Sequence, residues 1–336
     1  MSPRSAAFDL HTIAQDVADE FPEEIKGKYV IITGVSPGGI GQETTRAIAT
    51  KEPKLIVIAG RDSAKLEASF NAIKALVPKV NMQIVIIDLA SLQSVRDAAK
   101  KMLELGSPDV LINNAALMRC PYGVTQDGFE TQFGVNYVGP FLLTKLLLPT
   151  MLKTSHPRVV NVASYVHQQS DIRWDDIGFS EGKEYDPILA YGQSKTAKML
   201  TTVELAERYG KDGLVALSLH PGGICTPLQR HFKDEDYDPY RKMGIYKDDN
   251  TPNWDSGIWK TIEEGSATTL VAAFDPDKAQ INGSYLYDCQ LRDKSEVELE
   301  KAKPYAKDKT AAKRLWDMTE DTINRGGPKG TSAGSV

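Results

Sequence analysis

Short β-branched segments alternate with longer helical stretches along most of this 336-residue chain. The segment "YVIITG" precedes the helical pattern "GQETTRAIATKE", and "KLIVIAG" precedes "SAKLEASFNAIKALV". Further strand-like runs are "MQIVIIDL", "DVLINNA", "PRVVNVAS", "LVALSLHPG" and "NGSYLYD". Such continuous apolar runs are typical of strands buried on both faces of a parallel sheet. Because helical stretches separate them, we predict βαβ units, an α/β class and one doubly wound parallel sheet.

The rest of the chain reads as additions to a single domain. We predict these segments: an N-terminal extension at 1–26 with a short amphipathic helix near 13–17, the domain at 27–325, insertions at 165–189 and 227–256, and a disordered tail at 326–336. The two insertions are long, polar and weakly patterned, and the tail is rich in glycine and serine.

Composition excludes several classes of function. The net charge is −5 and the basic residues are spread throughout, which argues against a nucleic-acid surface. Three widely separated cysteines, Cys120, Cys225 and Cys289, predict a reduced, cytoplasmic protein. The five histidines are not grouped with these cysteines, so we predict no metal site. No apolar stretch reaches the roughly 18–20 residues of a membrane span.

A glycine cluster separates the first strand from the first helix in "VIITGVSPGGIGQETTRAI". Glycine permits a tight turn and close approach of the backbone to phosphates, and the following helix N-terminus offers free N–H groups. An ordinary glycine-rich turn is the alternative. The strand–turn–helix context favours a dinucleotide site, for which the candidates are Gly34, Ser36, Gly39, Ile40 and Gly41.

The second strand ends in "VIAGRD", which bears on the choice of cofactor. Enzymes for NAD(H) place an acidic residue at the end of this strand against the ribose 2′-hydroxyl. Here Gly60 takes that place and Arg61 follows, and a guanidinium pairs with a 2′-phosphate. We therefore predict NADP(H), with NAD(H) as the alternative because Asp62 is one residue away. A solvated surface arginine is the other reading of Arg61.

Seven motifs stand in order along the chain: "TGVSPGGIG", "DLAS", "NNAA", "FGVNYVG", "NVAS", "YGQSK" and "HPGGICT". Together, over about residues 27–290, they resemble the short-chain dehydrogenase/reductase family, which implies a Rossmann fold. The phrases "TQDGFETQFGVNYVGPFLLT", "EEGSATTLVAA" and "GSYLYDC" look most like the retinol-dehydrogenase and WW-domain-oxidoreductase branch and its fungal relatives. The chain shows neither a membrane anchor nor a WW module, so retinol specificity is not carried over.

The resemblance implies roles for particular residues. Asp88 and the Leu89 backbone would hold the adenine, and Asn114 and Ala115 would lie along the adenosine ribose. The nicotinamide end would be held by Pro221, Gly222, Ile224 and Thr226. Ser164, Tyr191 and Lys195 would be the reacting residues, with Asn136 holding a water.

Three departures from the family pattern stand out. Four residues rather than three separate Gly34 from Gly39, which leaves the register of the phosphate turn open. Ala116 replaces the last glycine of the usual NNAG, and Ala163 replaces the first of two usual serines.

The reacting residues fit carbonyl chemistry. A tyrosine has a pKa of about 10, so its phenol is a proton donor at neutral pH. Tyr191 and Lys195 are four residues apart and share one face of a helix, where the ammonium would favour the phenolate. Ser164 would orient the carbonyl oxygen at a strand end. In isolation the Tyr-x-x-x-Lys spacing is more often an ordinary surface pair.

We therefore predict an NADP(H)-dependent ketone or aldehyde reductase or alcohol dehydrogenase. An epimerase or C=C reductase is the alternative within enzymes, and a non-catalytic dinucleotide sensor is the alternative outside them. Aromatic residues in the two insertions suggest an apolar, aromatic or polyketide-like substrate of secondary metabolism: Trp174, Phe179, Tyr237, Tyr240, Tyr246 and Trp254. The same residues could instead pack the insertions onto the core. The resemblance further implies a homodimer or homotetramer formed through the helices that carry Asn136 and Tyr191.

Overall fold

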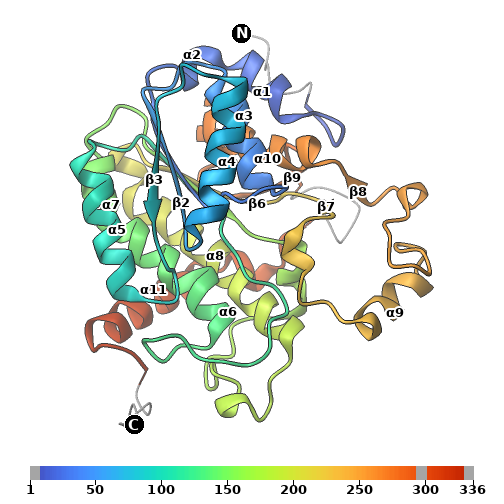
Figure 1. The fold of residues 1–336 in the computed structure, drawn as a ribbon. Coiled ribbons are helices and arrows are strands. Elements are labelled where there is room, and N and C mark those ends of the chain that lie inside the picture. The colour runs from blue at the N-terminus through green and yellow to red at the C-terminus, as the bar shows by residue number, and fades with distance from the viewer. Residues whose placement is uncertain (1–7, 293–300, 329–336) are drawn as a thin grey trace.

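A computed structural model describes residues 8–292 and 301–328 of the chain. Its main sheet holds eight strands in the order β10-β9-β6-β5-β4-β1-β2-β3, all parallel except the edge strand β10. The strands of this sheet are β1 Tyr29–Thr33, β2 Leu55–Gly60, β3 Met82–Ile86, β4 Val110–Asn113, β5 Arg158–Val162, β6 Val215–His220, β9 Tyr285–Tyr287 and β10 Gln290–Leu291. A separate two-stranded sheet pairs β7 Gly223–Ile224 with β8 Trp259–Lys260. The predicted α/β fold with a doubly wound parallel sheet is confirmed (Figure 1).

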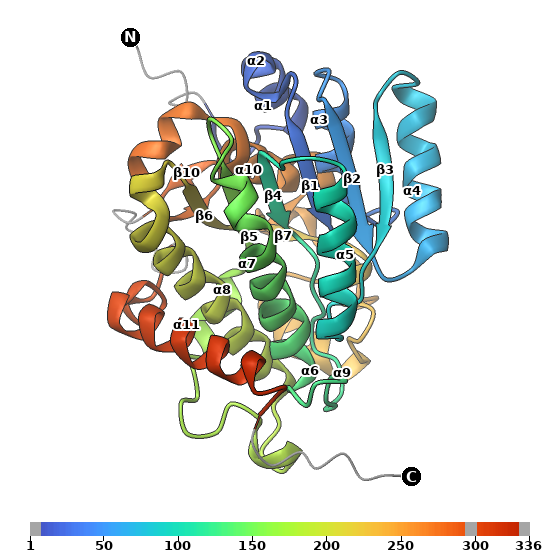
Figure 2. The ribbon, with the colours of Figure 1, turned by 90° about the vertical axis from the view of Figure 1, so that its left-hand side faces the viewer.

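Helices cover both faces of the sheet (Figures 1 and 2). Their bounds are α1 Ala14–Glu20, α2 Pro22–Ile25, α3 Ile40–Ala49, α4 Ser63–Leu76, α5 Leu92–Glu104, α6 Thr131–Phe133, α7 Gly139–Met151, α8 Pro187–Tyr209, α9 Asp234–Lys242, α10 Ile262–Phe274 and α11 Lys309–Asn324. One apolar cluster joins the sheet to α5, α7, α8 and α11, and a second joins the other face to α1, α3, α4 and α10. Strands buried in this way between two helical layers are expected to be apolar on both sides.

The strand order reverses between β1 and β4. From β1 the chain proceeds outward to β2 and β3, and then it returns to the other side of β1 at β4. The loops after β1 and β4 therefore diverge at the carboxyl ends of two adjacent strands. Open α/β sheets bind their ligands at such a point.

The ends of the described chain contribute to the core. Ala14 and Val17 of α1 are fully buried, and the helix lies against α10 and α3, so this part of the N-terminal extension belongs to the core. At the other end, α11 packs on α8, as Figure 2 shows, and its Trp316 side chain is buried. The main-chain N–H groups of Gly326 and Gly327 bond back to the end of α11. Most of the predicted disordered tail, residues 329–336, lies outside the described residues.

The helical segment between β4 and β5 is irregular. Helix begins only at Thr131, and a π-helical turn, Gly134–Val138, separates α6 from α7. This wider turn carries Asn136. Across residues 8–292 and 301–328, no helix combines the length and apolar character that a membrane crossing requires.

Candidate active site

The predicted site residues meet at the carboxyl ends of three adjacent strands. The glycine turn follows β1, Asn114 follows β4 and Ser164 follows β5, and these strands are neighbours in the sheet. Helix α8 lies over β5 and β6 and carries Tyr191 and Lys195. Three loops and one helix thus bring together residues as far apart in the sequence as Gly34 and Lys195.

The glycine turn lets neighbouring segments of the backbone approach one another closely. Gly34 has φ of +75°, and a Cβ at this position would lie 2.6 Å from the Ala115 Cα. A Cβ on Gly41 would lie 2.6 Å from the Asn114 Nδ2 and 2.7 Å from the Gly34 carbonyl oxygen. Only glycine fits these two positions, where the backbones of β1, α3 and the loop after β4 converge.

The extra residue in the turn is accommodated by Gly38. This glycine adopts φ of +70° with no neighbouring atom within 4 Å of its missing Cβ, while Ser36 and Gly39 close the turn by a 3.1 Å main-chain hydrogen bond. Gly39 is the N-cap of α3, where no side chain caps the helix, and Ile40 opens its first turn. The uncapped N–H groups of this turn suit the phosphates of a dinucleotide.

We expect Gly34→Ala to weaken dinucleotide binding by tenfold or more and to lower the free energy of unfolding by about 1–3 kcal/mol. The new methyl group would clash with Ala115, in addition to the strain of a positive φ. Gly38→Ala is the matched control, because it has the same strain but open space around it. Isothermal titration calorimetry and thermal melts measure both effects. Equal losses of affinity in the two variants would contradict a close-packed phosphate turn.

The loop after β4 is tied to the end of β1. The Asn114 side chain donates hydrogen bonds of 2.9 and 3.1 Å to the carbonyl oxygens of Thr33 and Gly34. The Ala115 N–H donates to the Thr33 hydroxyl at 3.1 Å. Both predicted ribose residues therefore also position the glycine turn.

The predicted adenine and 2′-phosphate residues follow β3 and β2. The Asp88 carboxylate accepts a hydrogen bond from the Ala90 N–H at 3.0 Å, and Leu89 is buried against Gly139 of α7. Arg61 is exposed and, within the described residues, has no ion pair. The neighbouring Asp62 caps α4, because its carboxylate accepts from the Lys65 N–H at 3.1 Å.

Tyr191, Lys195 and Ser164 come together as predicted. Tyr191 and Lys195 are 3% and 1% exposed, and the Lys195 Nζ lies 5.2 Å from the centre of the Tyr191 ring. Burial raises the pKa of the Tyr191 phenol above its usual value, and a hydrogen bond with the Ser164 hydroxyl opposes that rise. Burial lowers the pKa of Lys195 to about 7, and its ammonium donates a 2.9 Å hydrogen bond to the Val162 carbonyl.

A second buried lysine, Lys198, lies beside Lys195 and was not among the predicted site residues. The Lys198 Nζ donates to the Asn113 carbonyl at 2.8 Å and to the Val162 carbonyl at 3.4 Å, so the two lysines share one acceptor. Burial and the charge of Lys195 both lower the pKa of Lys198. Neither lysine has a carboxylate partner among the described residues. Lys198 lies seven residues after Tyr191, so the i, i+4, i+7 spacing of one helix face could have identified this lysine from the sequence.

Asn136 is fully buried, and its side chain already has partners. The Asn136 Oδ1 accepts from the Leu117 N–H at 2.7 Å, and the Nδ2 donates to the Leu117 carbonyl at 2.8 Å and to the Ser194 hydroxyl at 3.0 Å. The side chain therefore fixes the loop after β4 against α8. This arrangement assigns its side chain a positioning role, and a water would have to be held by its main-chain carbonyl.

The segment after β6 contains the residues predicted for the nicotinamide end. Pro221 and Gly222 follow β6 directly, and Gly222 has φ of +103°. Ile224 lies in β7 against Gly265 of α10. The Thr226 hydroxyl caps the following turn by accepting from the Leu228 N–H at 3.4 Å.

Two histidines near the site are structural. His167 is fully buried, its Nδ1 lies 2.7 Å from the Ser164 carbonyl, and its Nε2 accepts from the Lys303 N–H at 3.2 Å. Both ring nitrogens of His167 are therefore engaged within the structure. His220 is buried between the rings of Tyr165 and Tyr287, and burial lowers its pKa to about 3, as expected of a structural residue.

The aromatic residues of the two insertions divide into two groups. Trp174 packs against the core beneath the Arg314 guanidinium and anchors the first insertion, whereas Phe179 is fully buried within that insertion against Tyr185. In the second insertion Tyr237 contacts Tyr246, with ring centres 4.9 Å apart. Trp254 stays half-exposed.

Tyr240 reaches the catalytic end of the sheet. Its hydroxyl interacts with the Tyr165 phenol, and Tyr165 follows Ser164 directly. Burial, the first cause, and Tyr240 together raise the pKa of Tyr165 to about 12. Tyr165 was not among the predicted site residues, and its only signal in the sequence is its position next to Ser164.

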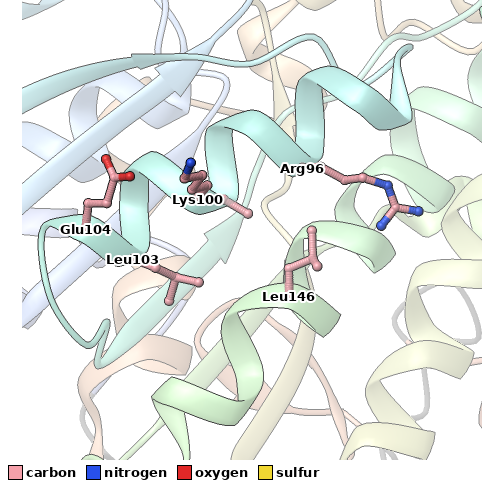
Figure 3. A pocket seen from close by; sticks show the side chains of 6 residues that line it. Arg96, Lys100, Leu103, Glu104 and Leu146 are labelled. Carbon is pink, nitrogen blue, oxygen red and sulfur yellow. The ribbon is translucent and has the colours of Figure 1, made fainter.

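A groove of about 400 Å³ between α5 and α7 lies apart from this site (Figure 3). Its lining includes Arg96, Lys100, Leu103 and Glu104 of α5 and Leu146 of α7. None of the predicted catalytic or cofactor residues lines it. We assign the reaction to the carboxyl ends of the strands.

Comparison with known proteins accounts for this arrangement. The family model described as short chain dehydrogenase matches residues 28–236. The chain belongs to the short-chain dehydrogenase/reductase family. Members of this family are oxidoreductases that bind a nicotinamide dinucleotide and act on alcohols and carbonyls. The glycine turn and the uncapped start of α3 fit the phosphates of a nicotinamide dinucleotide.

Three similar proteins illustrate the relationship. Short-chain dehydrogenase/reductase prx1 of Penicillium roqueforti is 39% identical over 311 residues, which are 90% of this chain and 86% of that protein. Retinol dehydrogenase 12 of Mus musculus is 35% identical over 297 residues, covering 88% of this chain and 86% of the mouse protein. The crystal structure of an uncharacterised protein from Mycobacterium paratuberculosis has a TM-score of 0.66 at 31% identity, covering 90% and 96% of the two chains. The predicted resemblance is confirmed.

Proposed function

We propose that the protein is an NADP(H)-dependent oxidoreductase that interconverts a ketone or aldehyde with the corresponding alcohol. The convergence of Ser164, Tyr191 and Lys195 beside the glycine turn carries this proposal. NADP(H), held by the glycine turn and the loops after β2, β4 and β6, would supply or accept the hydride. Oxidation of NADPH by the purified protein across a panel of aldehydes and ketones tests it.

The protein's own residues handle the proton and the oxygen. Because burial keeps Tyr191 a phenol at neutral pH, it can donate its proton to the substrate oxygen during reduction. The Ser164 hydroxyl donates a hydrogen bond to the same oxygen and stabilises its developing charge. In the oxidation direction Tyr191 accepts the alcohol proton, and the charged form of Lys195 stabilises the phenolate.

The preference for NADP(H) rests on Arg61. Its guanidinium is exposed at the end of β2, where a 2′-phosphate would lie, and Asp62 is engaged as the cap of α4. A guanidinium bonds a phosphate through charge-assisted hydrogen bonds, whereas an uncommitted carboxylate would repel it.

We expect Arg61→Ala to raise the KM for NADPH by about tenfold or more and to change the KM for NADH by less than about threefold. Steady-state kinetics with both cofactors measure the ratio. Lys65→Ala is the matched control, because it removes an exposed charge four residues further on and should leave the ratio unchanged. Equal increases for the two cofactors in Arg61→Ala would contradict the assignment.

We further propose an apolar or aromatic substrate. Phe232, Tyr237, Tyr246 and Trp259 form a continuous aromatic cluster in and beside the second insertion, with successive ring centres 4.8–5.3 Å apart. The similar mouse protein, retinol dehydrogenase 12, is named for an apolar substrate, which supports the same class of substrate for this chain. Product analysis separates this reaction from the epimerase and C=C reductase alternatives. Tight NADPH binding without turnover on any panel would instead favour the sensor.

Two remaining expectations stay proposals. All three cysteines are free, which supports a reduced, cytoplasmic location. Association of copies through α7 and α8 would have to accommodate α11, which packs on α8 with Trp316 buried. A partner subunit would therefore contact α11 as well.

A further inference from the structure

The Arg119 guanidinium is largely buried, and not all of its N–H donors have a hydrogen-bond partner. Its side chain is 10% exposed, and its Nη2 pairs with the Asp236 carboxylate of α9. The Nε is buried and has no hydrogen-bond partner within the described residues. The guanidinium carbon lies 4.7 Å from the centre of the Phe232 ring. A buried N–H without a partner is costly, and it calls for a ligand or a special reason.

Arg119 is held in a fixed place near the catalytic helix. It adopts a left-handed backbone conformation, φ 56°, in the loop after β4. Its main-chain N–H donates to the Gln132 side chain at 2.9 Å, and Gln132 in turn donates to the Pro187 carbonyl at the start of α8 at 2.9 Å. Two residues earlier, Leu117 is fixed by Asn136. Such support is typical of a residue that must present its side chain accurately.

Asp236 cannot accept hydrogen bonds from both the Nε and the Nη2 of Arg119. Its Oδ2 accepts a 2.8 Å hydrogen bond from the Lys233 N–H and thereby caps α9, so only its Oδ1 faces Arg119. A free carboxylate would bond the Nε and Nη2 together in the bidentate geometry that arginine favours. Helix α9 has no buried residue, which makes Asp236 a partner that can be displaced.

The same face of α9 touches a chain neighbour of the catalytic Ser164. Asp236 and Tyr240 are four residues apart and therefore share one side of the helix. Tyr240 interacts with Tyr165, which follows Ser164. Helix α9 thus contacts the loops after both β4 and β5, the strands whose ends hold the reacting residues. A substrate between these loops would lie within reach of Arg119 at one end and Ser164 at the other.

We propose that Arg119 binds a carboxylate of the substrate and that Asp236 occupies this position in the empty enzyme. The substrate class is then an apolar or aromatic keto acid, or the matching hydroxy acid, whose acid group pairs with Arg119 while its carbonyl meets Tyr191. Phe232 packs on the guanidinium and would flank the bound acid. This inference rests on the proposed carbonyl reduction.

The test compares acids with their esters. Purified enzyme with NADPH is assayed on aryl methyl ketones that carry a carboxylate on the ring, on a one-carbon arm or on a two-carbon arm, each beside its methyl ester. At least one acid should exceed its ester in kcat/KM. Arg119→Met should lower that acid's kcat/KM by about 30-fold or more and change the ester by less than about threefold. Arg119→Lys should give an intermediate loss, because an ammonium cannot bond in bidentate fashion.

Asp236→Asn distinguishes a substrate site from an ion pair that only holds α9 in place. If Asp236 competes with the substrate, its neutralisation should lower the KM of the acid by about threefold or more and leave the ester unchanged. If the ion pair only holds α9 in place, Asp236→Asn and Arg119→Met should impair acid and ester alike, and the proposal is overturned. Arg230→Met, which removes an exposed arginine of the same insertion, is the control for net charge.

Failure of this inference is distinguishable from failure of the proposed function. Reduction of neutral ketones with no preference for any acid over its ester overturns the Arg119 site alone. Absence of NADPH oxidation with every compound overturns carbonyl reduction. Calorimetric binding of the acids to NADPH-loaded enzyme and to Arg119→Met then still decides the site, since equal affinities overturn it. Circular dichroism melts establish that each variant is folded.

Discussion

Tyr191→Phe should lower carbonyl reduction by about 10²–10⁴-fold while NADPH binding is retained. The change removes one oxygen and keeps the ring, which is buried over Lys195. The phenol of Tyr165, which follows Ser164 directly, is engaged with Tyr240 and is therefore poorly placed to take over. The loss should therefore fall on kcat rather than on the affinity for the cofactor, since the proton is transferred only in the transition state.

Stopped-flow measurement of NADPH oxidation, together with titration of NADPH binding, checks this expectation. Tyr209→Phe is the matched control, because Tyr209 ends the same helix α8 and packs on Trp316, away from Ser164. Full activity in Tyr191→Phe would show that another group donates the proton. Loss of NADPH binding in the same variant would assign the tyrosine to cofactor binding instead.

The fold could be predicted because its strands are buried on both faces. Each main-sheet strand from β1 to β6 is an apolar run that stands out between amphipathic helices, so each was located to within about two residues. The short edge strand β10 and the pair β7–β8 escaped detection, since two residues carry no period. Helix α11 was missed as well, although its Ala312, Leu315 and Trp316 form an apolar stripe.

The catalytic residues could be predicted because they occupy fixed positions relative to the strand ends. Ser164 follows β5, and Tyr191 and Lys195 share a helix face, so spacing and motif order together were sufficient to place them. The partners of Asn136 could not be foreseen, because its bonds to Leu117 depend on a π-helical turn that no periodicity predicts.

The residues that we propose to surround the substrate could not be inferred from the sequence. Arg119 meets Asp236 across 117 positions, and Tyr165 meets Tyr240 across 75 positions. These contacts depend on how an irregular insertion folds back over the strand ends, and such a path has no local signature. The aromatic content of the insertions was visible, but only the structure separates Trp174, which packs on the core, and Phe179, which is buried within its insertion, from Tyr240, which contacts Tyr165.

Lys195→Met should remove most of the activity and yet stabilise the protein. Loss of the ammonium beside Tyr191 removes the stabilisation of the phenolate, so alcohol oxidation should fall by about 10²-fold or more. Burial lowers the pKa of Lys195 from 10.5 to about 7. Between these values the unfolded chain binds more protons than the folded protein, so the lysine destabilises the fold most at and below neutral pH and less as the pH rises.

Removing this cost should raise the free energy of unfolding at pH 7 by about 1–3 kcal/mol, after allowance for the hydrogen bond lost at the Val162 carbonyl. Thermal melts at pH 7 and pH 10 measure it, and the gain should shrink at the higher pH. Lys153→Met, at an exposed position after α7, should change neither activity nor stability appreciably. Lys198→Met should also stabilise the protein, because that lysine is buried beside Lys195 without a counter-ion among the described residues. A fall in stability for both buried variants would show that these lysines are held by more than the carbonyl oxygens of β4 and β5.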